Sequence, residues 1–179
     1  MEYRVGDSTD THRFEPGEAI LLCGVAIPCA YRLSGHSDGD APLHALTNAL
    51  LAIICAGDIG VHFSPDDPRW KGADSAIFVR HALESFQSQG WRIEHVNLTI
   101  VAQVPKIKPH REAMRKNVAQ LLGIALDRVN IQATTEEEMG YTGRLEGLRA
   151  KALVTAARPF SFKRWWKTRR TLFQAQFKN

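Results

Sequence analysis

Residues 36–57, HSDGDAPLHALTNALLAIICAG, open with a polar segment and continue as an apolar stretch with helical spacing. Asp40 can cap a helix and Pro42 is tolerated in a first turn, which predicts a helix over residues 41–56. His44 then lies close to the helix N-terminus, where free N–H groups and the helix dipole favour anions. We expect this end of the helix to face a functional site.

A second polar segment, Asp10-Thr11-His12, supplies two further candidate metal ligands. In an extended strand, a spacing of two residues points both side chains to one side. With His44 they make two imidazoles and one carboxylate, the three-ligand set of a catalytic zinc ion that keeps its fourth position open. The spacing is also common in proteins without a metal, so a surface histidine beside a turn aspartate stays open as an alternative. Asn48, one helical turn after His44, is expected to orient its ring.

Alternating strands and helices predict a single α/β (α+β) domain with a mainly four-stranded mixed sheet, helices together on one face and a small hairpin. The other face is then most simply covered by another copy of the chain. The predicted helices, besides residues 41–56, are Asp74–Gln89 and Pro109–Leu122. The predicted strands lie at Tyr3–Gly6, Asn97–Val104, Val129–Ala133 and Leu148–Ala156, with a hairpin of Ile20–Leu22 and Val25–Ile27.

Charge separates the chain into a body, residues 1–158, and a C-terminal tail, residues 159–179. The net charge is +4, but the tail holds six of the 23 basic residues and no acid, which leaves 17 basic against 19 acidic residues in the body. A body with this balance does not predict nucleic-acid binding. In the tail, aromatic residues such as Trp165 and Trp166 interleave with the basic ones, which is compatible with a frayed end, a membrane surface or a protein partner.

The three cysteines, Cys23, Cys29 and Cys55, lie in largely apolar sequence without a C-x-x-C spacing. They are therefore expected to be reduced core residues of a cytoplasmic protein. The sequence has no stretch that resembles a signal peptide and no apolar run of about 18 residues that would span a membrane.

Taken together, the motifs of residues 2–157 resemble the 2-C-methyl-D-erythritol 2,4-cyclodiphosphate synthases of the non-mevalonate isoprenoid pathway. The segments that carry the resemblance are Asp10-Thr11-His12, His36 to Thr47, Gly57-Asp58-Ile59-Gly60, Lys71-Gly72-Ala73-Asp74-Ser75, Ala102-Gln103-Val104-Pro105-Lys106, Ala133-Thr134-Thr135-Glu136-Glu137 and Gly140-Tyr141-Thr142-Gly143-Arg144.

The resemblance implies a homotrimeric enzyme that cyclises a cytidine diphosphate substrate with loss of CMP, at sites between subunits. Asp10, His12 and His44 would bind Zn²⁺ or another divalent transition metal, and Glu137 would bind Mg²⁺ or Mn²⁺. His36 and Thr135 would stabilise the transition state. The substrate-binding residues that it implies are His36, Ser37, Asp58, Gly60, Ala102, Pro105, Lys106, Ile107, Lys108, Ala133, Thr134, Thr135, Tyr141 and Arg144.

The chain departs from the family pattern at a few positions near these residues. Ser8 replaces a glycine, Asn48 replaces an aspartate, Glu138 replaces a lysine, and Pro65 lies in a varied loop. An amide at position 48 brings no charge, which could weaken zinc binding. Two other functions therefore stay open: a trimeric metal- and nucleotide-binding protein without turnover, and a scaffold whose tail binds a membrane or a protein.

Overall fold

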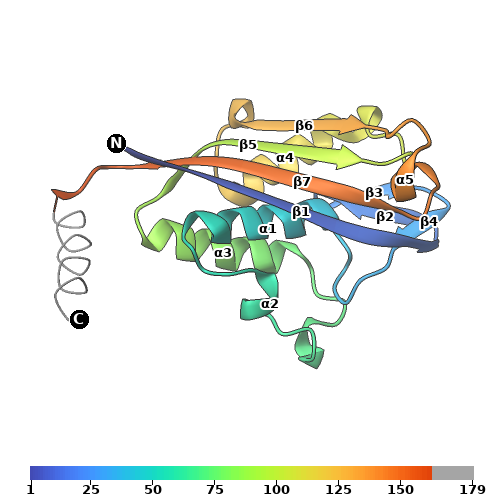
Figure 1. Ribbon diagram of the computed structural model, residues 1–179, viewed down its shortest axis with the longest axis horizontal. Coiled ribbons are helices and arrows are strands. Elements are labelled where there is room, and N and C mark those ends of the chain that lie inside the picture. The colour runs from blue at the N-terminus through green and yellow to red at the C-terminus, as the bar shows by residue number, and fades with distance from the viewer. Residues whose placement is uncertain (163–179) are drawn as a thin grey trace, which may run out of the picture.

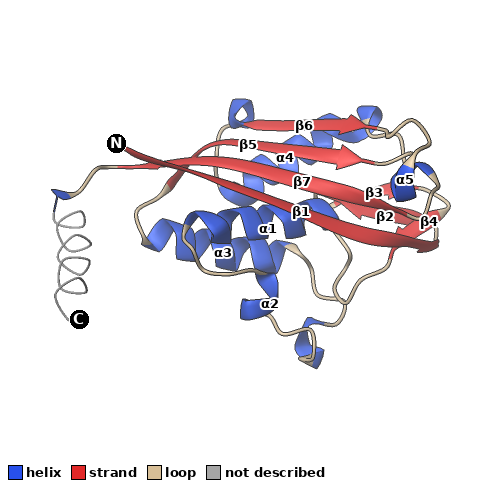
Figure 2. Cartoon of the chain, viewed as in Figure 1, coloured by secondary structure: helices blue, strands red, loops and turns tan. Residues whose placement is uncertain are grey.

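A five-stranded mixed sheet forms the centre of the computed structural model, which describes residues 1–162 (Figures 1 and 2). β5 and β6 run parallel, and the other neighbouring strands run antiparallel. In spatial order the strands are β4 (Tyr31–Leu33), β1 (Glu2–Pro16), β7 (Gly147–Arg158), β5 (Arg92–Val101) and β6 (Val129–Thr134). A separate antiparallel hairpin consists of β2 (Ala19–Leu22) and β3 (Val25–Pro28).

Three helices cover one face of the sheet: α1 (Ala41–Ile53), α3 (Ala76–Ser88) and α4 (Arg111–Leu122). In the view of Figure 1, α1 and α3 lie below β1 and α4 lies behind the strands. The connections between the elements contain the short helices α2 (Ile59–His62) and α5 (Gly140–Gly143) and 3-10 turns at Pro68–Trp70, Lys108–His110 and Leu126–Arg128.

The core lies between the sheet and the helices because alternate residues of the central strands are apolar. Leu98, Ile100 and Val154 point to the helical side and are fully buried, and Leu46 and Leu50 of α1 meet them from the other layer. This period of two in the strands and the 3.6-residue period in α1 are the patterns that predicted the elements. Hydrophobic burial therefore fixes which face of each strand meets the helices.

α1 lies unusually close to β1, and Gly6 is the reason. A Cβ atom at Gly6 would lie 2.0 Å from the carbonyl oxygen of Ala49, a separation that no side chain could tolerate. Further along, the Arg4 guanidinium donates to the Ile53 carbonyl at 2.7 Å. The helix therefore runs antiparallel to the strand, and its N-terminal end points toward the second half of β1.

The structure confirms the mixed sheet, the hairpin and the three helices on one face. The prediction of four strands is wrong, because β1 continues to Pro16 and pairs with β4 at residues Phe14 to Pro16. Residues 7–13 of β1 are polar on both sides of the strand, so this part lacks the apolar alternation that marks a half-buried strand. β5 also ends at Val101, earlier than the predicted strand end at Val104.

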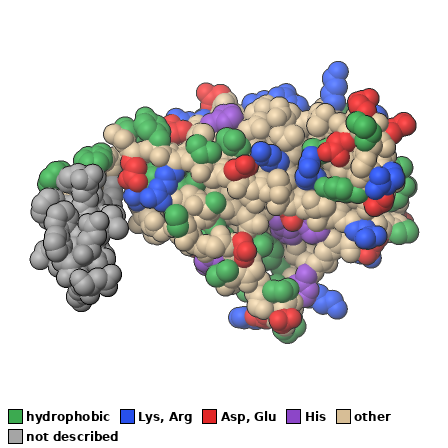
Figure 3. Space-filling model, in the orientation of Figure 1, with side chains coloured by type: hydrophobic (Ala, Val, Ile, Leu, Met, Phe, Trp, Pro, Cys, Tyr) green, Lys and Arg blue, Asp and Glu red, His purple; other side chains and the backbone are tan. Residues whose placement is uncertain are grey.

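The face of the sheet away from the helices is polar over the described residues (Figure 3). Lys151 pairs with Asp7 at 3.4 Å, and the Asn130 amide donates to the Asn97 side-chain oxygen at 2.7 Å. Tyr3 and Val5, at one end of β1, are apolar side chains that stay exposed on this face.

The cysteines are free, as predicted, but only one of them lies in the core. Cys23 is buried, Cys29 is half-buried and Cys55 is exposed, so the prediction of three core residues is wrong for Cys55. No helix within residues 1–162 is long and apolar enough to span a membrane. Of the predicted tail, residues 163–179 lie outside the described residues.

Candidate functional site

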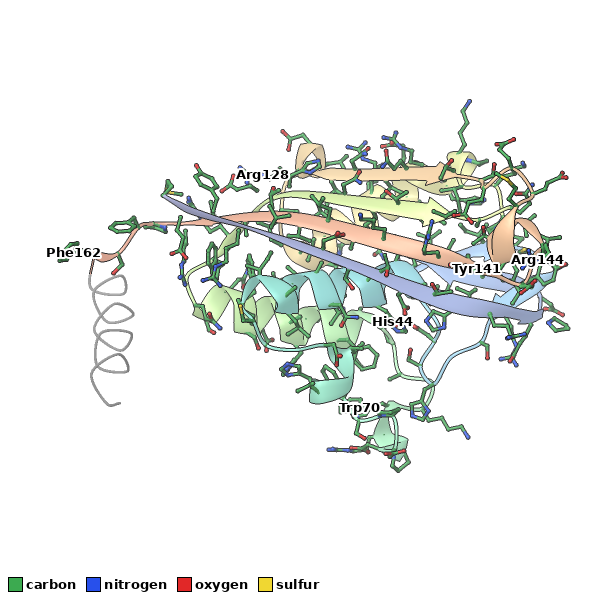
Figure 4. All side chains as sticks on the ribbon, in the orientation of Figure 1. His44, Trp70, Arg128, Tyr141, Arg144 and Phe162 are labelled. Carbon is green, nitrogen blue, oxygen red and sulfur yellow. The ribbon has the colours of Figure 1, made fainter. Side chains whose placement is uncertain are left out.

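Asp10 and His12 of β1 converge with His44, which lies near the start of α1 and is labelled beneath β1 in Figure 4. The His12 Nε2 atom lies 2.8 Å from Asp10 Oδ2 and 3.1 Å from His44 Nδ1, and His44 Nδ1 lies 3.1 Å from the same carboxylate oxygen. Among the His, Cys, Asp and Glu side chains of residues 1–162, these three form the group whose possible metal-ligand atoms all lie within 4.8 Å of one another. Three ligand atoms that face one another at this spacing can share one cation.

Hydrogen bonds on the far sides of the two rings set which nitrogens face the centre. His12 Nδ1 lies 2.5 Å from the Ser34 carbonyl oxygen, which can only accept, so Nδ1 carries the proton and Nε2 presents its lone pair. A carbonyl behind a ring nitrogen is a typical second partner of a metal-binding histidine. This geometry therefore favours a binding site for a divalent cation over the alternative of a surface histidine beside a turn aspartate.

The charges in this group reinforce one another. Burial by itself raises the pKa of Asp10, but hydrogen bonds from His12 and His44 outweigh it and hold that pKa well below its usual value. Burial likewise lowers the pKa of His12, yet the bond to Asp10 and its charge outweigh this effect and raise the pKa. In the absence of a metal, a proton on His12 thus balances the carboxylate.

Asp40 fixes the N-terminal end of α1 and thereby His44. Its carboxylate accepts from the backbone N–H groups of Cys23 at 2.9 Å, Gly24 at 2.6 Å and Leu43 at 3.1 Å. The side chain is fully buried, and this burial raises the pKa of Asp40 to about 7 against those three donors. The predicted helix cap is therefore present, and it also ties the helix to the β2–β3 hairpin.

Asn48 has a different partner from the one predicted. Its side-chain oxygen accepts from the Ile59 N–H at 2.8 Å and so supports the start of α2. Both ring nitrogens of His44 contact other residues: Nδ1 faces Asp10 and His12, and Nε2 lies near two serine hydroxyls. The prediction that Asn48 orients the His44 ring is therefore wrong, because the amide extends along the helix toward the next loop.

The other residues predicted near the metal surround this centre on loops. Ser37 places its Oγ atom 2.9 Å from His44 Nε2. His36 is exposed, and its backbone carbonyl accepts from the Gly72 N–H at 2.8 Å. Asp58 caps α2 by accepting from the Val61 N–H at 3.1 Å, and Gly60 follows it in an exposed position.

A second group of predicted residues lines one cavity of about 340 Å³ where β5 and β6 end. Ala102 and Ile107 give it buried apolar walls, and Lys106 and Lys108 are exposed basic residues. The lining residues are Ala102, Gln103, Pro105, Lys106, Ile107, Lys108, Ala133, Thr134 and Thr135. β7 lies between β1 and β5, so the cavity and the metal-ligand group belong to different parts of one chain.

The loop from β6 to β7 holds the remaining candidates. The Thr135 hydroxyl donates to Glu137 Oε1 at 2.8 Å, and Glu137 is exposed with a positive φ of 51°. The Tyr141 hydroxyl lies 3.4 Å from Thr11 Oγ1, and Arg144 pairs with Glu146 at 2.7 Å (Figure 4). Glu137 is thus positioned at the surface by Thr135.

Glu136 has a role that sequence reasoning missed. It was one of three consecutive acids, a pattern that also fits a solvated face. In the structure it accepts from Thr142 Oγ1 at 2.6 Å and from Arg149 at 2.7 Å. It therefore fixes the loop internally, whereas Glu137 and Glu138 extend into solvent.

The sequence model of the YgbB family matches residues 3–157, which include all of the elements described above except the first residue of β1 and the last residue of β7. The chain belongs to the YgbB family.

Curated relatives of this YgbB-family chain are longer proteins. The chain is 52% identical over 158 residues to the bifunctional enzyme IspD/IspF of Brucella abortus, covering 88% of this chain and 40% of that protein. It is 53% identical over 156 residues to the protein of the same name from Caulobacter vibrioides, covering 87% and 41%. The chain thus spans about two fifths of the length of these relatives.

Solved structures share the fold of this YgbB-family chain. The bifunctional IspDF of Campylobacter jejuni superimposes with a TM-score of 0.84 at 33% identity, over 90% of this chain and 44% of that one. A 2C-methyl-D-erythritol-2,4-cyclodiphosphate synthase in a CDP-bound form gives a TM-score of 0.79 at 36% identity, over 86% of this chain and all of that one. The likeness extends to chains without a second domain.

We expect zinc affinity to fall as the pH is lowered, because zinc must displace the proton from His12. Below the raised pKa of His12, the loss should approach about tenfold per pH unit. Competition with a chromophoric chelator between about pH 5.5 and pH 8 measures this slope. His81→Ala is the matched control, since His81 contacts His62 at 3.1 Å outside the metal-ligand group and should leave the slope unchanged. Affinity that is independent of pH would contradict the assignment of His12 as a ligand.

Proposed function

We propose that this chain is a 2-C-methyl-D-erythritol 2,4-cyclodiphosphate synthase. It would convert 4-diphosphocytidyl-2-C-methyl-D-erythritol 2-phosphate to the cyclodiphosphate and CMP. The observation that carries the proposal is the convergence of Asp10, His12 and His44 on β1 and α1 in a chain of the YgbB family. A solved structure of a 2C-methyl-D-erythritol-2,4-cyclodiphosphate synthase in its CDP-bound form supports the substrate class.

The reaction transfers a phosphoryl group within one molecule. An oxygen of the 2-phosphate attacks the β-phosphorus and forms a new P–O bond. The bond from the β-phosphorus to the oxygen that bridges to the α-phosphate breaks, and its electron pair leaves with CMP. Because both reacting groups are anionic, catalysis depends on positioning and charge neutralisation.

The charges in the site suit this requirement. Asp10, His12 and His44 would hold Zn²⁺ or another divalent transition metal, and Glu137 would hold Mg²⁺ or Mn²⁺; when bound, these cations neutralise phosphate charge. Glu137 is exposed to solvent, and the hydrogen bond from Thr135, a residue that lines the cavity, keeps it beside the cavity.

The remaining residues would bind the two ends of the substrate. In the cavity of about 340 Å³, apolar walls suit a pyrimidine ring and the two lysines suit its phosphates. Thr134 and Thr135 would donate to the diphosphate, with Thr135 and His36 stabilising the transition state. The methylerythritol phosphate would contact His36, Ser37, Asp58 and Gly60, and Tyr141 and Arg144 would lie at the edge of the site. The free cysteines fit a reducing, cytoplasmic setting.

³¹P NMR of the purified protein with the substrate, Zn²⁺ and Mg²⁺ tests the proposal, and it predicts a cyclic diphosphate and CMP. Glu137→Gln should slow the reaction by on the order of 100-fold, the scale for one charge-stabilising group. Glu138→Gln is the matched control: Glu138 is adjacent and exposed, and its loss should change the rate less than about twofold. Unchanged substrate in the presence of bound zinc would instead support the alternative of a binding protein without turnover.

We also propose a homotrimer whose active sites lie between subunits. The metal-ligand group and the cavity lie on opposite sides of β7, so neither gives a complete site within one chain. The polar sheet face opposite the helices, with Tyr3 and Val5 exposed at one end, provides the surface for neighbouring copies.

Co-expression of two inactive variants tests this arrangement. His12→Ala disables the metal-ligand half of the site and Lys106→Ala weakens the cavity half, so random mixing should restore roughly a quarter of the wild-type activity. A mixture of His12→Ala with His44→Ala is the control and should stay inactive, because both changes fall in the same half. If the first mixture is as inactive as the control, the sites lie within single chains.

A further inference from the structure

The Lys71-Gly72-Ala73-Asp74-Ser75 segment has no role in the assignments above, yet it contacts His44 on the side of the ring that faces away from Asp10 and His12. Ser75 is fully buried at the start of α3, and its Oγ atom lies 2.8 Å from His44 Nε2. The segment is tied to residues 36–38 by two backbone bonds, from the Gly72 N–H to the His36 carbonyl at 2.8 Å and from the Asp38 N–H to the Ala73 carbonyl at 3.1 Å. Ser75 therefore has a fixed position relative to His44.

Asp38 determines the direction in which the Ser75 hydroxyl points. Its Oδ1 atom accepts from the Ser75 hydroxyl and from the Asp40 N–H at 3.1 Å, and its Oδ2 atom accepts from the Ser75 N–H at 2.9 Å. An ionised carboxylate can only accept hydrogen bonds, so all three of these neighbours must donate to Asp38. The Ser75 hydroxyl proton is therefore directed to Asp38.

We propose that Asp38 and Ser75 are positioning residues that prepare His44 for the metal. Because the Ser75 hydroxyl donates its one proton to Asp38, its oxygen can only accept from His44, so Nε2 carries the ring proton and Nδ1 presents its lone pair to Asp10 and His12. The Ser34 carbonyl has the corresponding role for His12: it accepts from Nδ1 and leaves Nε2 facing the centre of the site. Once the His12 Nε2 proton leaves, all three ligand atoms face the centre with free electron pairs, which is the state that a divalent cation requires.

This inference rests on the metal site of the proposed function, and it assigns different roles to Ser75 and Ser37, two serines that both contact His44. Ser37 also places its hydroxyl oxygen 2.9 Å from His44 Nε2, but within residues 1–162 no carboxylate accepts the Ser37 hydroxyl proton as Asp38 accepts that of Ser75. The two serines thus form a matched pair. Both hydroxyl oxygens lie at nearly the same distance from His44 Nε2, but only the Ser75 hydroxyl donates to a carboxylate.

The test is zinc affinity, measured by chelator competition on Ser75→Ala, Asp38→Asn and Ser37→Ala. Asp38→Asn keeps the shape but puts an NH₂ group against a donor in either orientation, because all three neighbours donate. We expect about a 10- to 100-fold loss of affinity for Ser75→Ala and Asp38→Asn, the scale for loss of an outer partner of a ligand, and less than about threefold for Ser37→Ala.

A second readout separates positioning from general damage. In the zinc-loaded wild type, the His44 Nε2 proton should give a slowly exchanging NMR signal, which Ser75→Ala should shift or remove and Ser37→Ala should retain. Thermal unfolding of the metal-free proteins identifies any variant that fails to fold. If Asp38→Asn does not fold, the zinc affinity of Ser75→Ala alone tests the positioning role.

Two results would overturn the inference in different ways. If wild type binds zinc tightly and Ser75→Ala and Asp38→Asn bind it within about threefold as well, the positioning role is absent and the proposed function is untouched. If wild type binds no zinc, the metal site of the proposed function fails, and this inference fails with it.

Discussion

The close contact between α1 and β1 is the constraint on which the site depends. Only glycine fits at position 6, where the helix backbone meets the strand, and the antiparallel course of the two elements follows from the contacts at Gly6 and Arg4. Since His44 precedes Ala49 along the helix while Asp10 and His12 follow Gly6 along the strand, this contact brings them together. Asp40 then fixes the helix N-terminus at the hairpin. A bulkier residue at position 6 would separate the two elements and with them the ligands.

The electrostatics of the site follow from where protons are held. The Ser34 carbonyl accepts on the far side of the His12 ring, and the Ser75 hydroxyl, which itself donates to Asp38, accepts on the far side of the His44 ring. Both ring protons thus point outward, while Asp10 is kept ionised between the two imidazoles. The result is a concentration of electron pairs beside a helix N-terminus, which suits a cation and an anionic ligand at the same time. This combination is what a reaction between two phosphate groups needs.

Periodicity predicted the elements better than it predicted their ends or their partners. The apolar alternation in β5 and β7 and the helical spacing in α1 were sufficient to locate them, because burial of one face enforces both patterns. The second half of β1 was missed because residues 7–13 are polar on both faces and only Phe14, beyond them, enters the core; β4 was missed with it. Polar strands of this kind are specified by pairing and by the ligands they carry, which no local pattern reveals.

The same limit applies to the site. Asp10, His12 and His44 could be proposed from spacing and residue type, and the resemblance to a family supplied residues that the structure gathers around one cavity. Asn48 was wrongly placed, because helical spacing predicts proximity to His44 but not which backbone group the amide reaches. The family resemblance included Ser75, but its contact with His44 could not be found from sequence, since the two residues are distant along the chain and only tertiary packing brings them together.

X-ray absorption at the zinc edge of the zinc-loaded protein tests the central claim most directly. The account predicts nitrogen and oxygen ligands at about 2.0–2.2 Å, two of them with the scattering of imidazole rings, and one imidazole fewer in His44→Ala. Sulfur at about 2.3 Å, or a spectrum that His44→Ala leaves unchanged, would contradict it and place the metal elsewhere in the chain.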